Sequence, residues 1–245
     1  MQNANYIFGI RTVIEAINAD KNISKLLIKT NSKSELISEL LLLVAQKNIP
    51  YQYVPEAKIN SLTRKNHQGV LAFISPIEFY SIEDIVPSLF ENGINPFILV
   101  LDQLTDIRNF GAIVRTAECA GVNAIVIPQK GAASINADAV KTSAGALHVI
   151  PVCREKNLIK TVKFLKDSGI QVIAVTEKSE KLYTQSDYTG PVALVLGAED
   201  SGIDPEILRI SHEFAKIPVF GKIASLNVSV AAGILMYECI RQRAI

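Results

Sequence analysis

Short, continuous apolar runs recur through the last three-fifths of the chain and are separated by segments with helical spacing. The runs cover residues 97–101, 124–127, 171–175 and 192–196, and the helical segments cover residues 109–120, 158–168 and 228–243. Apolar runs without alternating polar positions indicate strands that are covered on both faces. Strands that alternate with helices are typical of a mostly parallel sheet. We therefore predict an α/β domain with a mostly parallel sheet for residues 98–245.

The first third of the chain has the pattern of a smaller α/β unit. Helical spacing covers residues 13–17 and 35–47, and short β-rich runs cover residues 26–28, 51–54 and 70–74. The pattern is then interrupted at Pro76, Pro87, Gly93 and Pro96. Such residues mark connecting segments. We therefore predict two domains, residues 1–75 and 98–245, joined by a linker over residues 76–97.

Composition indicates a globular protein and leaves its partners open. The chain has 245 residues, 49% of them hydrophobic and 20% charged, with a net charge of +1, which is a globular composition. Residues 1–75 carry nine basic and five acidic side chains, a local net charge of +4. This excess fits either a solvated surface or a module that binds a polyanion. The basic residues include Lys21, Lys25, Lys29, Lys33, Arg64 and Lys65.

Several common functions find no support in the sequence. It has no apolar run of about 18 residues for a membrane span, and residues 1–5 lack the pattern of a signal peptide. Neither a dinucleotide-binding glycine motif nor a P-loop nor a hydrolase nucleophile elbow occurs. The three histidines are too scattered for a zinc site, so we expect no metal.

Three widely spaced cysteines, Cys119, Cys153 and Cys239, also bear on the cell compartment. Their odd number and spacing favour free thiols in a reducing cytoplasm over a disulfide framework. Each lies in a largely apolar stretch. We therefore expect three small core residues rather than nucleophiles.

Three polar segments follow apolar runs of the predicted sheet, after Asp102, Leu196 and Val219. Ligands of parallel α/β sheets bind beyond the carboxyl ends of the strands. In the first segment, Asn109 could cap a helix or contact a ligand. Arg115 lies deeper in this apolar helix, and if it is buried it needs a partner or an anionic ligand.

The other two segments allow the same pair of interpretations. Gly197 and Gly202 flank an acidic pair, which could form a simple turn or let a ligand approach the backbone closely. Ser225 and Asn227 could cap the last helix, or could place polar groups at a helix start where anions bind. Each segment is a weak signal alone. Their joint position at strand ends is a much stronger one.

Together the three segments resemble the motifs of the SpoU (TrmH-type) RNA ribose 2′-O-methyltransferases of the SPOUT superfamily. The matching stretches are Asn-x-Gly-x-x-x-Arg-Thr-Ala at 109–117, Gly-x-Glu-x-x-Gly at 197–202 and Ser-Leu-Asn-Val-Ser-Val-Ala at 225–231. Residues 8–10, 13–16 and 67–70 resemble the substrate-binding domain of this family, and the combination is most similar to its enzymes for a guanosine of bacterial 23S rRNA. One departure is Ile107, which stands where the family often has proline.

The resemblance implies a fold, a cofactor and partners. The fold is a small α/β substrate-binding domain followed by an α/β SPOUT domain whose carboxyl-terminal segment threads a trefoil knot. The methyl donor is S-adenosylmethionine, with Gly197, Ile217 and Leu226 as its expected contacts. The partners are RNA and a second copy of the chain in a homodimer, with no role for DNA, a membrane or a metal.

The matched positions also imply catalytic residues. Asn109 and Arg115 are expected at the ribose–phosphate of the RNA, and Glu199 is expected to orient Arg115 or the substrate. Ser225 and Asn227 are expected to shape their loop and to hold Arg115 or RNA. The high pKa of an arginine makes it a poor general base. We therefore expect Arg115 to bind phosphate and to stabilise the developing alkoxide.

Three alternatives stay open from the sequence. The first is the same reaction on tRNA or another RNA. The second is a non-catalytic RNA-binding factor for ribosome assembly, which the joint presence of the five polar motif residues disfavours. The third is a nucleotide-dependent metabolic enzyme of generic α/β type, which would need a phosphate-binding motif that the chain lacks.

Overall fold

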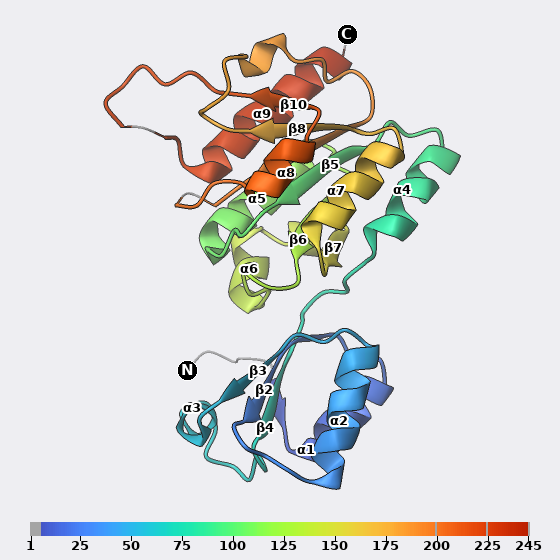
Figure 1. The fold of residues 1–245 in the computed structure, drawn as a ribbon, viewed down its shortest axis with the longest axis vertical. Helices are drawn as coiled ribbons and strands as arrows, with labels where there is room; N and C mark the ends of the chain where they lie inside the picture. The colour runs from blue at the N-terminus through green and yellow to red at the C-terminus, as the bar shows by residue number, and fades with distance from the viewer. Residues whose placement is uncertain (1–5, 199, 224, 245) are drawn as a thin grey trace. The chain divides into compact units, whose positions relative to one another are not determined.

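The structure is a computed structural model that describes residues 6–198, 200–223 and 225–244. The chain forms two compact units: the described residues up to Glu78, with the short segment Ile135–Ala137, make the first, and the other described residues make the second (Figure 1). Each unit has its own sheet and its own buried core. The α/β class predicted from the sequence is therefore confirmed for both parts of the chain.

The first unit is a four-stranded mixed sheet with strand order β1-β4-β2-β3. Strand β4 is antiparallel to β1 and to β2, whereas β2 and β3 are parallel. The elements are β1 (Tyr6–Phe8), α1 (Ile10–Asn18), β2 (Ile23–Lys29), α2 (Glu35–Gln46), β3 (Tyr51–Val54), α3 (Glu56–Asn60) and β4 (Val70–Ile74).

Helices α1 and α2 cover one face of this sheet. Val13 and Ile17 of α1 are buried together with Leu40 and Val44 of α2, and all four belong to the cluster that contains Leu26 of β2. Among the described residues, the opposite face carries the short helix α3 and a smaller cluster. The two faces of this sheet are therefore covered to different extents.

The second unit is built on a six-stranded sheet in the order β10-β8-β9-β5-β6-β7, and every pair in it is parallel. The strands are β5 (Phe97–Leu101), β6 (Ala124–Pro128), β7 (Val152–Glu155), β8 (Gln171–Val175), β9 (Val192–Leu196) and β10 (Glu213–Ala215). The helices are α4 (Ile82–Glu91), α5 (Ile107–Cys119), α6 (Ala137–Thr142), α7 (Leu158–Asp167), α8 (Pro205–Ile210) and α9 (Val228–Arg243), with single 3₁₀ turns at Ala146–His148 and Tyr183–Gln185.

Helices cover both faces of the second sheet. Ile98 and Val100 of β5 share a buried cluster with residues of α4, α7 and α8, and α5 packs against α9 in another layer. All five residues of β5 and of β9 are buried. The prediction of a parallel sheet covered on both faces is therefore confirmed.

One helix lies where the sequence pattern indicates a linker. Helix α4 spans Ile82–Glu91, and Pro87 lies inside it rather than at a break. Ser81 caps the helix, and Ile82 and Val86, four residues apart, are buried in the core of the second unit. Burial of this pair outweighs the hydrogen bond that a proline removes from a helix. Residues 79–91 therefore belong to the core of the second unit.

Candidate active site

Three polar segments begin at the carboxyl ends of neighbouring parallel strands. They follow β5, β9 and β10, which lie in the order β10-β8-β9-β5 (Figure 1). Parallel strands present their carboxyl ends at one edge of a sheet. The segments after Leu101, Leu196 and Ala215 therefore leave the sheet at the same edge. This edge is where the sequence predicts a ligand site.

Asn109 and Asn227 meet at this edge, although they are 118 positions apart. The Nδ2 group of Asn227 donates a hydrogen bond to Oδ1 of Asn109 at 3.0 Å. Oδ1 of Asn227 accepts from the backbone amide of Ser229 at 2.9 Å and from its Oγ at 2.6 Å. Asn227 thus caps α9, as predicted, and also joins the first sequence motif to the third.

The start of α5 differs from the sequence prediction. Asp106, not Asn109, is the cap, and its Oδ1 accepts a hydrogen bond from the amide of Asn109 at 2.7 Å. Helix α5 begins at Ile107, the position where the related sequences often have proline. An aspartate cap can start the helix without the fixed φ of a proline. It leaves the side chain of Asn109 available for its contact with Asn227.

Arg115 is exposed on the outer face of α5, together with Glu118 and Cys119. The sequence allowed for a buried Arg115 that needs a partner, and the structure places this guanidinium at the surface instead. Positions three and four residues apart share one helix face. Arg115, Glu118 and Cys119 therefore mark the side of α5 that faces away from the sheet.

The three cysteines differ in their surroundings. Cys153 and Cys239 are buried, and burial raises the pKa of each thiol to about 12. Neither is a reactive nucleophile, as predicted. Cys119 is exposed, so the expectation of a third core cysteine is wrong. It follows Glu118 on the outer face of α5, where its apolar neighbours in sequence point the other way.

Gly197 is packed so closely that a side chain could not fit. A Cβ atom at this position would lie 2.2 Å from the carbonyl carbon and oxygen of Gly202 and 2.5 Å from the amide nitrogen of Ile203. The amide of Gly202 donates to the carbonyl of Ala198 at 2.9 Å. The loop after β9 thus folds back onto its own start. Glu199, the predicted orienting residue, lies outside the described residues.

The segment between β10 and α9 projects from the sheet as a long loop (Figure 1). Ile217 is half-buried near its start, and Leu226 is 37% exposed near its end. Ser225 is exposed and lies two residues before the cap of α9, so it is not the cap itself. The same loop exposes Phe220 at 95% and Ile223 at 78%. Apolar surface is thus available beside the polar groups of the edge.

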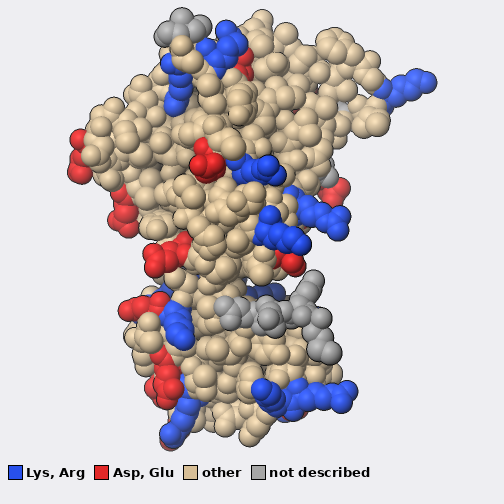
Figure 2. Space-filling model, turned by 180° about the vertical axis from the view of Figure 1, so that it is seen from behind, with Lys and Arg blue, Asp and Glu red and all other residues tan. Residues whose placement is uncertain are grey.

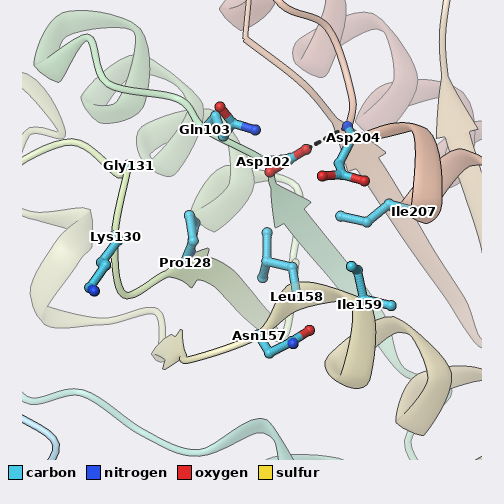
Figure 3. A pocket seen from close by; sticks show the side chains of 10 residues that line it. All are labelled: Asp102, Gln103, Pro128, Lys130, Gly131, Asn157, Leu158, Ile159, Asp204 and Ile207. Carbon is cyan, nitrogen blue, oxygen red and sulfur yellow. Dashed lines mark hydrogen bonds between the residues drawn. The ribbon is translucent and has the colours of Figure 1, made fainter.

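A pocket of about 420 Å³ opens beside the loop after β5 (Figure 3). Two carboxylates lie at one end of it, and Oδ2 of Asp102 accepts a hydrogen bond from the backbone amide of Asp204 at 2.7 Å. Burial raises the pKa of the Asp102 carboxyl above its ordinary value, and the hydrogen bond from Asp204 opposes this change. The lining residues are Asp102, Gln103, Pro128, Lys130, Gly131, Asn157, Leu158, Ile159, Asp204 and Ile207.

Sequence reasoning identified neither Asp102 nor Asp204 as a site residue. The sequence held a signal for Asp102, because it directly follows an apolar run, and the structure leaves it only 4% exposed. A charged residue in that place needs a partner. Its partner is a backbone amide 102 positions further along the chain, which no local pattern reveals.

The first unit has a second candidate surface on the sheet face that α1 and α2 do not cover. Tyr6, Phe8 and Phe73 are half-buried there, and the Tyr6 ring lies 6.4 Å from the Phe8 ring and 6.3 Å from the Phe73 ring between centroids. Lys65 lies 5.9 Å from the centre of the Phe8 ring, and Lys25 is exposed opposite Phe73 in the strand register. Aromatic rings beside basic groups are suited to single-stranded nucleic acid.

Charge elsewhere is mixed. On the face drawn in Figure 2, basic and acidic side chains are interspersed over both units. Within the described ranges, no helix has the length and hydropathy needed to cross a bilayer. No group of three or more His, Cys, Asp or Glu side chains in the described part of the chain is arranged for a metal.

Residues 96–237 match the SpoU rRNA Methylase family. The chain belongs to this family. Residues 6–80 of the methylase match the family described as RNA 2′-O ribose methyltransferase substrate binding. It is 35% identical over 242 residues to YacO of Bacillus subtilis strain 168, a protein assigned to the TrmH family of tRNA/rRNA methyltransferases, with 99% of this chain and 97% of YacO covered.

Solved structures place the methylase among enzymes of both RNA classes. It resembles an AdoMet-bound rRNA methyltransferase from Sinorhizobium meliloti, with a TM-score of 0.62, 26% identity and coverage of 96% of this chain and 86% of that one. It also resembles a TrmH/SpoU tRNA modifying enzyme from A. aeolicus, with a TM-score of 0.55, 31% identity and coverage of 66% and 84%. The methylase is therefore an RNA ribose 2′-O-methyltransferase by family.

Proposed function

We propose that this enzyme transfers a methyl group from S-adenosylmethionine to the ribose 2′-hydroxyl of a guanosine in 23S rRNA. The observation that carries the proposal is the hydrogen bond between Asn109 and Asn227, which joins two sequence motifs at the carboxyl edge of the sheet. The solvent-exposed Arg115 projects from the same helix as Asn109. Polar groups from two motifs are thus held in place before any substrate arrives.

The residues proposed to hold the cofactor fit its chemistry. Gly197 offers main-chain groups in a loop without room for a side chain, while Ile217 and Leu226 offer apolar surface. When bound, S-adenosylmethionine supplies an electrophilic methyl group on a positively charged sulfur. The close approach of Gly202 and Ile203 accounts for the glycine at position 197, and its main-chain groups are those proposed to contact the cofactor.

Each polar residue then has a role in placing the ribose. Asn109 and Asn227 position the sugar through their amide groups, and Arg115 binds the adjoining phosphate and stabilises charge that develops on the 2′-oxygen. Accurate placement of two reacting groups can supply several kcal/mol of barrier reduction. Glu199 and Ser225 are proposed as supports for Arg115 and the loop.

The first unit is proposed to bind the RNA. Its rings at Tyr6, Phe8 and Phe73 can stack on unpaired bases, and Lys25 and Lys65 can contact phosphates. RNA recognition commonly uses loop nucleotides rather than duplex. Because phosphate contacts release counterions, the affinity should fall as salt is added.

A second copy of the chain is proposed as the partner of α9, with the site near the interface. Val230 and Tyr237 are 52% and 53% exposed on this helix, seven positions apart and therefore on one face. The neighbouring loop exposes Phe220 and Ile223. Large apolar surfaces of this kind mark interaction sites. A cytoplasmic location and the trefoil knot remain predictions.

Transfer to tRNA is the second candidate, and the 31% identity with the A. aeolicus tRNA modifying enzyme favours it. The deciding measurement is transfer of labelled methyl groups to unmodified 23S rRNA and tRNA in parallel. We expect label in one 23S guanosine and at least about a hundred-fold loss in Arg115→Ala. Label in tRNA alone would show that tRNA, and not 23S rRNA, is the substrate. Near-full activity of Arg115→Ala would remove the role given to that residue.

A further inference from the structure

The pocket in Figure 3 combines one buried and one half-buried carboxylate, Asp102 and Asp204, with apolar walls. Asp102 is 4% exposed, and the side chains of Leu158 and Ile207 beside it are also buried. Such a lining disfavours a phosphate, because two carboxylates repel an anion. It suits a flat apolar group that carries N–H donors on one edge. The volume of about 420 Å³ lies within the range of small-molecule sites, about 300–1,000 Å³.

Each carboxylate has one oxygen engaged by the protein. Oδ2 of Asp102 accepts from the Asp204 amide at 2.7 Å, and Oδ1 of Asp204 accepts from the Glu206 amide at 2.7 Å. These bonds fix the two carboxylates at one end of the pocket. Within the described part of the chain, the other oxygen of each group accepts no further hydrogen bond, so it can accept one from a ligand.

The pocket shares two loops with the proposed catalytic edge, although none of the residues proposed to hold the ribose or the cofactor lines it. Gln103, which lines the pocket, lies in the loop between β5 and α5. This loop ends at Asp106, the cap of α5, and Asn109 lies in the first turn of that helix. On the other side, Asp204 directly follows Ile203, whose amide packs against Gly197. The same two loops therefore build the pocket and the groups proposed to hold ribose and cofactor.

We propose that this pocket holds the guanine base of the nucleotide whose ribose is methylated, with Asp102 and Asp204 accepting its N1–H and N2–H groups. The assignment rests on the proposed function and names the residues that would make it specific. Guanine alone presents two adjacent donor groups on its Watson–Crick edge, whereas adenine, cytosine and uracil each present a single donor group there beside one or two acceptors. The apolar walls contact the faces of the base.

Asp204→Asn is the sharpest variant. Asparagine caps a helix as well as aspartate does, so α8 should keep its start while the pocket loses an acceptor. Glu206→Gln is the matched control, because it removes a carboxylate from the same helix outside the pocket lining, where Glu206 makes only an exposed pair with Arg209 at 3.4 Å.

The experiment measures dissociation constants of guanosine, inosine and adenosine by calorimetry, with excess S-adenosylhomocysteine to fill the cofactor site. Inosine lacks the N2 amino group. We expect guanosine to bind about ten-fold to about a hundred-fold more tightly than inosine or adenosine. Asp204→Asn should remove this preference and Glu206→Gln should keep it. Equal affinities in the wild type, or an unchanged preference in Asp204→Asn, would overturn the assignment.

A second measurement separates the pocket from the reaction. Unmodified 23S rRNA and tRNA are methylated with labelled cofactor, digested to nucleosides and analysed by mass spectrometry. Product restricted to 2′-O-methylguanosine supports the pocket, whereas 2′-O-methyladenosine or a methylated pyrimidine overturns it and leaves the chemistry intact. Absent cofactor binding and absent product would overturn the proposed function instead, and a guanosine preference lost in Asp204→Asn would still support the pocket.

Discussion

The two units use their sheets in different ways. The sheet of the first unit is covered by α1 and α2 on one face and leaves rings and lysines accessible on the other. The sheet of the second unit is covered on both faces, so only its carboxyl edge can present polar groups. A half-open sheet provides a broad surface for weak contacts, whereas a covered sheet provides a rigid edge for placing atoms. Substitutions at the edge should therefore have larger effects than substitutions on the open face.

The largest effect is expected at Gly197. In Gly197→Ala the new Cβ would collide with the backbone of Gly202 and Ile203 at 2.2–2.5 Å, so the loop after β9 must move. We expect a loss of about 1–3 kcal/mol in the free energy of unfolding, and at least about ten-fold weaker S-adenosylmethionine binding. Urea denaturation and calorimetry measure the two quantities.

Gly190→Ala is the control for this substitution. A Cβ at Gly190 meets nothing within 4 Å, so the same chemical change occurs in the same unit without a collision. If the two variants have equal stability and equal cofactor affinity, then the loop after β9 can rearrange to accommodate a Cβ atom at little cost.

The next effect is expected at Asn227. Asn227→Asp keeps an oxygen to cap α9 but removes the amide that donates to Asn109. We expect methyl transfer to fall about ten-fold to about a hundred-fold through misplacement of the ribose, with stability near that of the wild type. Asn227→Ala should also lose about 1 kcal/mol of stability with the cap. Single-turnover kinetics and thermal unfolding separate positioning from capping. Full activity of Asn227→Asp would mean that the hydrogen bond with Asn109 serves only the fold.

Much of the second unit could be predicted because its strands are short apolar runs, and such runs are rarely found in solvent-exposed helices, strands or loops. Residues 97–101 and 192–196 match β5 and β9 in full. Helix α4 escaped prediction because Pro87 is a breaker in any local rule, and only tertiary burial of Ile82 and Val86 overrides it. The hydrophobic pattern of the sequence therefore predicts the helices and strands that short-range sequence features determine, and misses those that depend on tertiary packing.

The sequence pattern also predicted only part of the candidate site. Asn109 and Asn227 were found because they stand in motifs, but their hydrogen bond spans 118 positions. Asp106 took the capping role given to Asn109, since any of several polar residues before an apolar run can cap. The pair of Asp102 and Asp204 had no motif at all. Interactions between loops of different strands depend on the sheet order, which the sequence pattern does not contain.

On the open face of the first unit the expected effect is smaller and depends on salt. Replacing both Lys25 and Lys65 by alanine should raise the dissociation constant for RNA several-fold. It should also reduce the slope of log affinity against log salt by about 0.7 for each phosphate that is no longer neutralised by a lysine. Filter binding over a salt series measures this. The control replaces Lys21 and Lys33, two exposed lysines of the same unit. An identical change in slope for both pairs would mean that charge, not this face, governs binding.

The smallest effect is a pH dependence of stability in the second unit. Burial, with a smaller contribution from Lys166, lowers the pKa of His212 below 6.5, and its Nδ1 accepts a hydrogen bond from the amide of Val172 at 2.9 Å. A lowered pKa means that the folded chain takes up this proton less readily than the unfolded chain. Its contribution to stability is therefore present above pH 6.5 and is lost as the pH falls below that value.

In His212→Asn an amide oxygen can accept the same hydrogen bond from the Val172 amide without titrating. Melting temperatures measured from pH 7.5 to about pH 5.5 should therefore fall slightly more in the wild type than in His212→Asn, because solvent around the exposed His212 side chain weakens the effect. His148→Asn is the control for the loss of a histidine elsewhere in the same unit. If the melting temperatures of the wild type and His212→Asn fall equally with pH, then protonation of His212 does not affect the stability of the second unit.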